Sequence, residues 1–147
     1  MKTMRTQIVT GLCLIFGMSW SVNALEIGQA APEFKLQDQN GEWQSLEQYR
    51  GQWVAVYFYP KNDTPGCTTE ACAFRDNIFA FDEINAVVLG ISLDDVKSHA
   101  KFAEKYSLPF PILADVKKAT AKSYGVYTKM VGFEMAKRET FIIDPEG

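Results

Sequence analysis

Residues 53–59 constrain the fold more than any other part of the chain. Their sequence, Trp-Val-Ala-Val-Tyr-Phe-Tyr, is apolar at both odd and even positions. Because successive side chains of a strand point to opposite faces of its sheet, a strand of this kind has to be covered on both sides. Residues 86–91 have the same character. The two runs therefore predict a parallel sheet with helices packed on both faces.

The segments around these two runs predict an alternation of strands and helices. Apolar side chains at 67, 71, 74, 78 and 81 follow helical spacing and predict one helix over 67–81. Residues 95–106 predict a second helix, which we expect Pro109 and Pro111 to end. This alternation is typical of an α/β sandwich with short right-handed crossovers. The remaining elements that we expect are a hairpin turning at Asn40-Gly41 between 35–38 and 42–43, a strand at 111–114, a helix at 117–124 and a strand at 140–143.

The end of the sequence predicts a turn rather than a completed domain. Residues 144–147 read Asp-Pro-Glu-Gly, with proline at the second position of the expected turn. The strand at 140–143 then has no hairpin partner in the chain. We therefore expect the sequence to be truncated, with at least one further strand and a helix beyond Gly147.

Composition limits the chain to one globular domain. Of its 147 residues 47% are hydrophobic and 22% are charged, which are ordinary proportions for a folded protein. The net charge of −3 argues against a basic surface for nucleic acid. His99 is the single histidine, so a zinc site built on several histidines is excluded. Three cysteines are too few for a disulfide scaffold or a cysteine-only zinc site.

Residues 1–24 have the layout of a secretory signal peptide. Lys2 and Arg5 stand at the start without any acid, residues 8–20 are uncharged and mostly apolar, and Val22-Asn23-Ala24 closes the segment. A membrane anchor is the alternative, but the apolar run is shorter than the roughly 20 residues that span a bilayer; an organellar transit peptide is a second alternative. We expect cleavage after Ala24, export to the periplasm or outside the cell, no stable membrane anchor, and a mature domain over 25–147.

The loop that follows the first buried strand places a cysteine where chemistry is common. In open α/β sheets, functional groups gather at the carboxyl ends of strands. Cys67 comes after such a strand, in the first turn of the expected helix, where free N–H groups and the helix dipole favour a thiolate. Cys67 also lines up with Ala71 and Phe74, as a small buried side chain would. Its position alone leaves both interpretations open.

Other residues of the loop allow the same two interpretations. Thr64 stands three residues before Cys67 and offers a hydroxyl to a thiolate or a ligand oxygen, but threonine is equally common as a helix cap. Pro60 and Pro65 stiffen the loop and remove two N–H donors, which is also what turn residues do.

The whole segment resembles the active-site loop of the peroxiredoxins. Residues 57–70 read Tyr-Phe-Tyr-Pro-Lys-Asn-Asp-Thr-Pro-Gly-Cys-Thr-Thr-Glu, in the form of the bacterioferritin comigratory protein, or PrxQ, branch. Pro60, Thr64 and Cys67 match the family motif P-x-x-x-T-x-x-C. The similarity extends over nearly all of 26–147. It includes Gly28, Ala31, Pro32, Phe34, Leu36, Asp38, Gly41, Phe74, Arg75, Asp76 and residues 140–144.

The resemblance implies a thioredoxin-like fold, with a central mixed sheet flanked by helices, and a peroxidase without haem, metal or flavin. By this resemblance Cys67 attacks the O–O bond of hydrogen peroxide or an organic hydroperoxide and becomes a sulfenic acid. Thr64 would hold the thiolate and the peroxide oxygen. Pro60 and Gly66 would border the substrate, with the N–H groups of Gly66 and Cys67 stabilising the leaving oxygen.

The family also uses an arginine on a late strand, and Arg138 is the matching residue. It stands two residues before Thr140-Phe141, in a stretch that is shorter than is usual in this branch. An ordinary surface arginine at the start of a strand would look the same. Arg75, one or two helical turns beyond Cys67, is the competing candidate, although a salt-bridged helix face explains it equally well.

Cys72 is the resolving thiol by the same resemblance, which makes the protein an atypical 2-Cys peroxidase with a Cys67–Cys72 disulfide; an inert helix cysteine is the alternative. We expect a thioredoxin-like or other dithiol protein as reductant and a monomer or weak dimer. Residues five apart in an α-helix have Cα atoms roughly 8.7 Å apart, whereas a disulfide needs about 4.4–6.8 Å. The first turns of the helix must therefore unwind before the bond forms.

Two other classes of protein remain as alternatives. A thioredoxin-like thiol–disulfide oxidoreductase of the cell envelope would need a C-x-x-C motif, and Cys67 and Cys72 lack that spacing. A secreted binding module with a structural disulfide conflicts with the helix geometry. His99 is expected to be a solvated helix residue; a catalytic histidine is the alternative, but nothing near it in the sequence favours that role.

Overall fold

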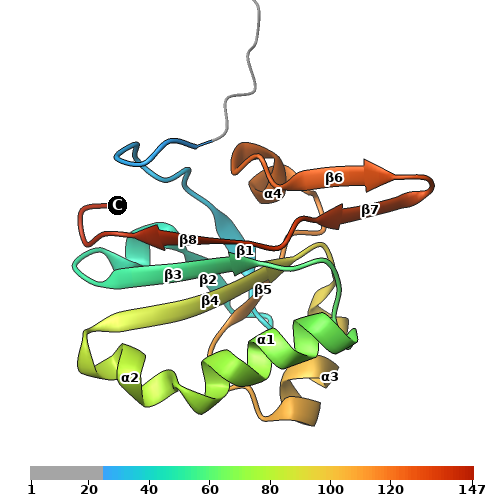
Figure 1. Ribbon diagram of the computed structural model, residues 1–147, viewed down its shortest axis with the longest axis horizontal. Helices are drawn as coiled ribbons and strands as arrows, with labels where there is room; N and C mark the ends of the chain where they lie inside the picture. The colour runs from blue at the N-terminus through green and yellow to red at the C-terminus, as the bar shows by residue number, and fades with distance from the viewer. Residues whose placement is uncertain (1–24) are drawn as a thin grey trace, which may run out of the picture.

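The protein is described by a computed structural model over residues 25–147; the expected signal peptide, residues 1–24, lies outside this part of the chain. A six-stranded sheet forms its centre, in the spatial order β2-β1-β5-β4-β3-β8 (Figure 1). Its strands are β1 (Lys35–Gln37), β2 (Trp43–Ser45), β3 (Trp53–Phe58), β4 (Ala86–Ser92), β5 (Ile112–Ala114) and β8 (Glu139–Ile143).

The sheet is mixed, as a thioredoxin-like fold requires. Strand β3 pairs in parallel with β4, with Val54 opposite Val87, and in antiparallel fashion with β8, with Val56 opposite Phe141. Strand β5 continues the parallel part beside β4. At the other edge β1 and β2 form the antiparallel hairpin that the Asn40-Gly41 turn predicts.

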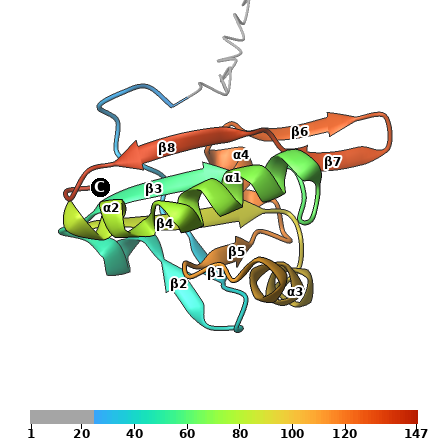
Figure 2. The same cartoon turned by 60° about the horizontal axis from the view of Figure 1, so that its bottom comes forward.

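Helices cover both faces of this sheet, which confirms the prediction from residues 53–59. On one face lie α1 (Pro65–Asp76), α2 (Ile78–Glu83) and α3 (Val96–Tyr106) (Figure 1). On the other lies α4 (Ala119–Ser123), near a separate hairpin of β6 (Tyr127–Met130) and β7 (Phe133–Ala136). This hairpin extends past the end of the main sheet (Figure 2). A short 3-10 helix, Leu46–Tyr49, follows β2.

Alternate side chains of β3, continued by Tyr59 directly after the strand, build two separate cores. Val54, Val56 and Phe58 belong to a cluster that includes Ala121 and Tyr124 beside α4. Ala55, Tyr57 and Tyr59 belong to the cluster beneath α1 and α3, which contains Cys67, Ala71 and Phe102. The second cluster matters for function, because it fixes the position of a cysteine thiol.

The structure corrects two details of the expected elements. The single helix predicted over 67–81 is divided at Asn77, whose φ of −111° and ψ of 11° are not helical, and it begins two residues earlier, at Pro65. Helix α3 ends at Tyr106, as the sequence predicted, and its C-cap residue Ser107 lies in the left-handed region at φ 52°, before either proline. The β6–β7 hairpin was not expected from the sequence.

The helices of residues 25–147 are all short or polar by the standard of a bilayer. None of them combines the length and the apolar character that crossing a membrane requires.

Candidate active site

The loop between β3 and α1 positions Cys67 in a buried, helix-capped setting. Thr64 is the N-cap residue, with extended backbone at φ −93° and ψ 150°, and Pro65 is the first residue of the helix. Proline suits that position, because its missing N–H would have no acceptor inside the helix. Cys67 is the third helical residue and is 1% exposed. The N–H groups of this first turn are therefore available to an anion.

Arg138 brings a positive charge against the sulfur. It lies between β7 and β8, and its Nη2 donates to Cys67 Sγ at 3.1 Å. Its Nη1 donates to a carboxylate oxygen of Glu70 on the next turn of α1. The guanidinium therefore donates directly to the sulfur and is held in that position by Glu70. The motif comparison predicted that Arg138 completes the site, and the structure places its guanidinium against Cys67 Sγ.

Gly66 makes room for that guanidinium. A Cβ built on Gly66 would lie 3.2 Å from Arg138 Nη2, closer than ordinary van der Waals contact. The backbone of Gly66 has no need of a positive φ, since it is part of α1. Glycine at this position thus allows the close approach of Arg138.

Glu70 is a site residue that the sequence reasoning missed. Its half-buried side chain pairs with Arg138. Burial raises the pKa of Glu70, and the charge and hydrogen bond of Arg138 oppose that shift. For Arg138, burial lowers the pKa, but the hydrogen bond and charge of Cys67 together with Glu70 outweigh it and the pKa is raised. Helical spacing offered a signal, because Glu70 stands three residues after Cys67.

Arg75, the competing candidate, is engaged elsewhere. Its Nε pairs with Asp76 at 2.8 Å and its Nη1 donates to the carbonyl oxygen of Tyr106 at 2.8 Å. It therefore ties the end of α1 to the end of α3, as a salt-bridged helix face would.

Thr64 and Pro60 lie in the loop but do not contact the sulfur through a hydrogen bond. The hydroxyl of Thr64 donates to the carbonyl oxygen of Lys61 at 3.1 Å. Pro60 stands two residues after the end of β3. Of the expected site residues, the structure joins Cys67, Gly66 and Arg138.

Cys67 and Cys72 both lie in α1, and both are free thiols. Cys72 is partly exposed, whereas Cys67 is buried next to the aromatic cluster that includes Phe74. With an intact α1, the helical repeat keeps their Cα atoms roughly 8.7 Å apart. The reduced arrangement expected from the sequence is confirmed, and it is incompatible with a disulfide.

His99 corrects an expectation. The sequence predicted a solvated residue, but its side chain is 0% exposed. Helix α3 turns His99, Phe102 and Ala103 toward the core, at the spacing of one helical face. That spacing was visible in the sequence, and it gave the signal that the prediction overlooked.

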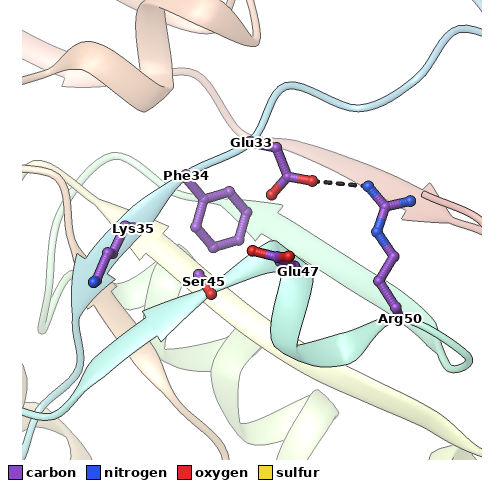
Figure 3. A pocket seen from close by; sticks show the side chains of 6 residues that line it. All are labelled: Glu33, Phe34, Lys35, Ser45, Glu47 and Arg50. Carbon is purple, nitrogen blue, oxygen red and sulfur yellow. Dashed lines mark hydrogen bonds and ion pairs between the residues drawn. The ribbon is translucent and has the colours of Figure 1, made fainter.

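A surface pocket of about 670 Å³ is lined by residues other than Cys67 and Arg138 (Figure 3). It is lined by the first strands and the 3-10 helix, where Glu33 pairs with Arg50 at 2.8 Å. Its lining residues are Glu33, Phe34, Lys35, Ser45, Glu47 and Arg50.

Within residues 25–147, no group of three or more His, Cys, Asp or Glu side chains is placed to hold a metal ion.

Comparisons with known proteins agree with this geometry. Residues 27–147 match the AhpC/TSA family. The chain is 46% identical over 127 residues to peroxiredoxin Bcp of Bacillus subtilis, covering 84% of this chain and 81% of that protein. It is 47% identical over 120 residues to chloroplastic peroxiredoxin Q of Populus jackii, covering 82% of this chain and 56% of that protein.

Solved structures give the same result. Peroxidoxin BcpB of Mycobacterium tuberculosis superposes with a TM-score of 0.76 at 40% identity, covering 81% of this chain and 79% of that one. The bacterioferritin comigratory protein of Xanthomonas campestris superposes with a TM-score of 0.72 at 36% identity, covering 78% and 75%. The thioredoxin-like fold is thereby confirmed, and the envelope oxidoreductase is not favoured. The chain belongs to the AhpC/TSA family, beside its Bcp and PrxQ peroxiredoxins, and is a thiol-dependent peroxidase.

Proposed function

We propose that Cys67 is the nucleophile of this peroxidase. The observation that carries the proposal is the contact of 3.1 Å between Arg138 Nη2 and Cys67 Sγ at the open start of α1. The thiolate attacks one oxygen of the peroxide, an S–O bond forms and the O–O bond breaks. The leaving oxygen takes a proton and departs as water or an alcohol, and the sulfur becomes a sulfenic acid.

The charge that develops on the leaving oxygen has donors already in place. The N–H groups of Gly66 and Cys67 lie in the first turn of α1 and have no acceptor within the helix. Donors that are fixed before the reaction need no reorganisation during it. We assign to Thr64 the role of holding the peroxide, with its hydroxyl turning from the Lys61 carbonyl toward the substrate. Pro60 borders the same loop.

Cys72 is proposed as the resolving thiol. Its thiolate attacks the sulfenic sulfur of Cys67, an S–S bond forms, and the oxygen leaves as water after taking a proton. Helix α1 has to open for this step, because the intact helix holds the two residues too far apart. A dithiol protein of the thioredoxin type then supplies two electrons and reopens the disulfide.

The substrates that we propose are hydrogen peroxide and organic hydroperoxides. The bacterioferritin comigratory protein of Xanthomonas campestris has alkyl peroxide reduction activity. In the present chain Pro65 and Gly66 precede Cys67 in the first turn of α1, and the reduced thiol is buried, so we expect the loop to move when a peroxide binds. We propose a monomer or weak dimer as the working form.

Two serine variants test the two cysteine roles. Cys67→Ser should abolish turnover of hydrogen peroxide and of an alkyl hydroperoxide, followed by stopped-flow tryptophan fluorescence. Cys72→Ser should react once at the wild-type rate, then stall as sulfenic acid and over-oxidise, which mass spectrometry detects. Turnover by Cys67→Ser would refute the assignment of the nucleophile. Normal turnover of Cys72→Ser with a dithiol protein would remove Cys72 from the mechanism.

Export is proposed from the pattern of residues 1–24. The signal peptide would be cleaved after Ala24, leaving a periplasmic or secreted enzyme whose reductant belongs to the cell envelope. Mass spectrometry of the protein from its native host should find Leu25 as the first residue. An intact Met1 on soluble protein would contradict the proposal.

A further inference from the structure

Asn62 connects the active-site loop to the interior of the protein. It stands five residues before Cys67, and only 8% of it is exposed. Its Nδ2 lies 2.9 Å from Ser98 Oγ and 2.9 Å from His99 Nδ1, both on α3. Its Oδ1 accepts a hydrogen bond of 2.7 Å from the hydroxyl of Tyr59. All the polar atoms of this side chain therefore have partners.

The position of the proton on His99 follows from the other side of its ring. Nε2 lies 3.1 Å from the carbonyl oxygen of Leu113 on β5, and a carbonyl can only accept. Nε2 must therefore carry a hydrogen. Burial lowers the pKa of His99, against the opposing effects of Asp94, the Leu113 carbonyl and Asp95, so the ring is neutral at neutral pH. Nδ1 is then bare and accepts from the Asn62 amide.

We infer that His99 is a positioning residue of the peroxidase. By accepting at Nδ1 and donating at Nε2, it fixes the amide of Asn62 and, through it, the loop that presents Thr64 and Cys67 to Arg138. The inference rests on the proposed role of Cys67. It gives a function to a buried histidine that makes no contact with the sulfur.

A second set of contacts shows that α3 is the platform for this loop. The backbone N–H of Asn62 donates to Asp94 Oδ2 at 2.8 Å, just before α3 begins. Asp63, whose φ is 58°, accepts from Lys105 Nζ at 2.7 Å and from the Tyr106 hydroxyl at 2.6 Å near the end of α3. The Asp63 contacts are exposed, whereas the His99 contact is buried.

This difference in burial decides which anchor matters most. Exposed ion pairs contribute little because water screens them. A buried hydrogen bond is costly to lose, since the groups that remain have no water to replace the partner. Removing the His99 hydrogen bonds should therefore loosen the loop, while removing the Lys105 charge should change it little.

The test compares two substitutions of His99 with a control on the same helix. His99→Leu keeps an apolar filling but leaves Asn62 Nδ2 and the Leu113 carbonyl short of partners. His99→Gln keeps one donor and one acceptor on a planar group. Lys101→Ala alters an exposed residue of α3 outside the network. We expect His99→Leu to lower the rate of Cys67 oxidation by about tenfold or more, with His99→Gln within about threefold and Lys101→Ala unchanged.

Three further measurements separate positioning from general stability. Amide exchange should rise in residues 60–66 of His99→Leu while α3 stays protected. The rate of Cys67 alkylation by iodoacetamide is measured as a function of pH. This pH profile should shift in His99→Leu and return to the wild-type profile in His99→Gln. Since His99 is the only histidine, ¹⁵N-histidine labelling of the wild type reports one ring, which should carry its proton on Nε2.

These outcomes keep the inference distinct from the proposed function. Wild-type protein that consumes no peroxide would refute the function, while alkylation and the ¹⁵N spectrum would still report on the loop. A wild-type oxidation rate in folded His99→Leu would overturn the inference. So would a proton on Nδ1 with a bare Nε2, a result that needs no variant to fold.

Discussion

At the scale of single residues, the site depends on one guanidinium with two partners. Arg138 contacts Cys67 with one nitrogen and Glu70 with another. The planar fork of arginine suits this arrangement, because its nitrogens point in fixed directions. Glu70 therefore holds Arg138 in line with the sulfur, and the positive charge cannot turn away to solvent without losing that pair.

A lysine in place of Arg138 tests whether the fork or the charge matters. Arg138→Lys keeps the charge but cannot reach both partners in the same geometry. A hydrogen bond to a charged group contributes about 1.5–3 kcal/mol, so the second-order rate of Cys67 oxidation should fall by about 10- to 100-fold. Stopped-flow fluorescence with hydrogen peroxide measures it.

Arg75→Lys is the matched control. It changes an arginine of α1 that pairs with Asp76 and the Tyr106 carbonyl, and it should leave the oxidation rate within about twofold of the wild type. A larger loss in Arg75→Lys than in Arg138→Lys would mean that Arg75 serves the reaction after all.

The buried His99 also makes a prediction about stability and pH. Its pKa in the folded protein is lowered below 6.5, so the unfolded chain binds the proton first as the pH falls. The contribution of neutral His99 to the free energy of unfolding is therefore fully present above pH 6.5. It decreases as the pH falls below 6.5 toward the pKa of His99 in the folded protein. Tyr59, Asp94 and Asp95 are the titratable groups around the ring.

Urea unfolding between pH 7.5 and pH 5 measures this effect. One proton gives a slope of at most about 1.4 kcal/mol per pH unit. His99→Gln removes the titrating group, so the variant should show a flatter profile over the same range. Identical profiles for the two proteins would mean that His99 titrates alike in the folded and unfolded states.

At the scale of elements, the sequence predicted what periodicity controls and missed what depends on tertiary contacts. The two-sided apolar run gave β3, and the Asn40-Gly41 turn gave the β1–β2 hairpin. The break at Asn77 was invisible, because the apolar spacing continues across it from Phe74 to Ile78. The β6–β7 hairpin has exposed apolar residues at its tip, such as Val131, and thus lacks the alternation that marks a strand.

The same contrast applies to the candidate site. Cys67 and Arg138 were predictable because a motif names them. Helical spacing placed Glu70 beside Cys67, but its pairing with an arginine 68 residues away was not predictable, and neither was the contact of the Asn62 amide with α3. Contacts between distant segments leave no periodic trace in the chain.

The opening of α1 should respond to helix propensity at an exposed position. Thr69 lies between the two cysteines and faces solvent, and its hydroxyl donates to the carbonyl oxygen of Pro65. Thr69→Ala and Thr69→Gly both lose that bond, so its effect cancels between them. Glycine disfavours the helix by about 1 kcal/mol relative to alanine, which shifts the opening equilibrium by about fivefold.

This shift can be measured from the competition between two reactions of the Cys67 sulfenic acid, disulfide formation with Cys72 and over-oxidation by peroxide. Faster opening in Thr69→Gly should let Cys72 trap the sulfenic acid sooner. Mass spectrometry should then find that about fivefold more peroxide is needed to over-oxidise half of Cys67 than in Thr69→Ala. Equal sensitivity in the two variants would show that helix opening does not limit resolution.

At the scale of the whole molecule, the two cores have different duties. The cluster beside α4, which contains Leu89, includes no residue of α1. The cluster beneath α1 contains Tyr57, whose ring stacks on Phe74 at 4.6 Å between centroids. The Tyr57 hydroxyl is buried there without a hydrogen-bond partner in the described chain, which is a local cost to this core. The proposed opening of α1 would disturb this core and leave the other packed.

One substitution in each core separates these duties. Leu89→Ala should lower the free energy of unfolding by about 2–5 kcal/mol in both the reduced and the disulfide form, because its surroundings stay packed in both. Phe74→Ala should be costly in the reduced form and much less so in the oxidised form, where the opening of α1 has already withdrawn Phe74 from Tyr57. Urea titrations of the reduced and the disulfide form of each variant give the four changes in the free energy of unfolding.

The difference for Phe74→Ala has a second, independent readout. A substitution that destabilises the reduced form alone favours oxidation, so the reduction potential of the Cys67–Cys72 pair must become more negative. Each 1.4 kcal/mol of difference corresponds to about 30 mV for this two-electron couple. Titration against glutathione measures the potential, which should move in Phe74→Ala and stay constant in Leu89→Ala. Equal destabilisation of both forms by Phe74→Ala, with an unchanged potential, would mean that α1 keeps its packing in the oxidised enzyme and that the disulfide forms by another movement.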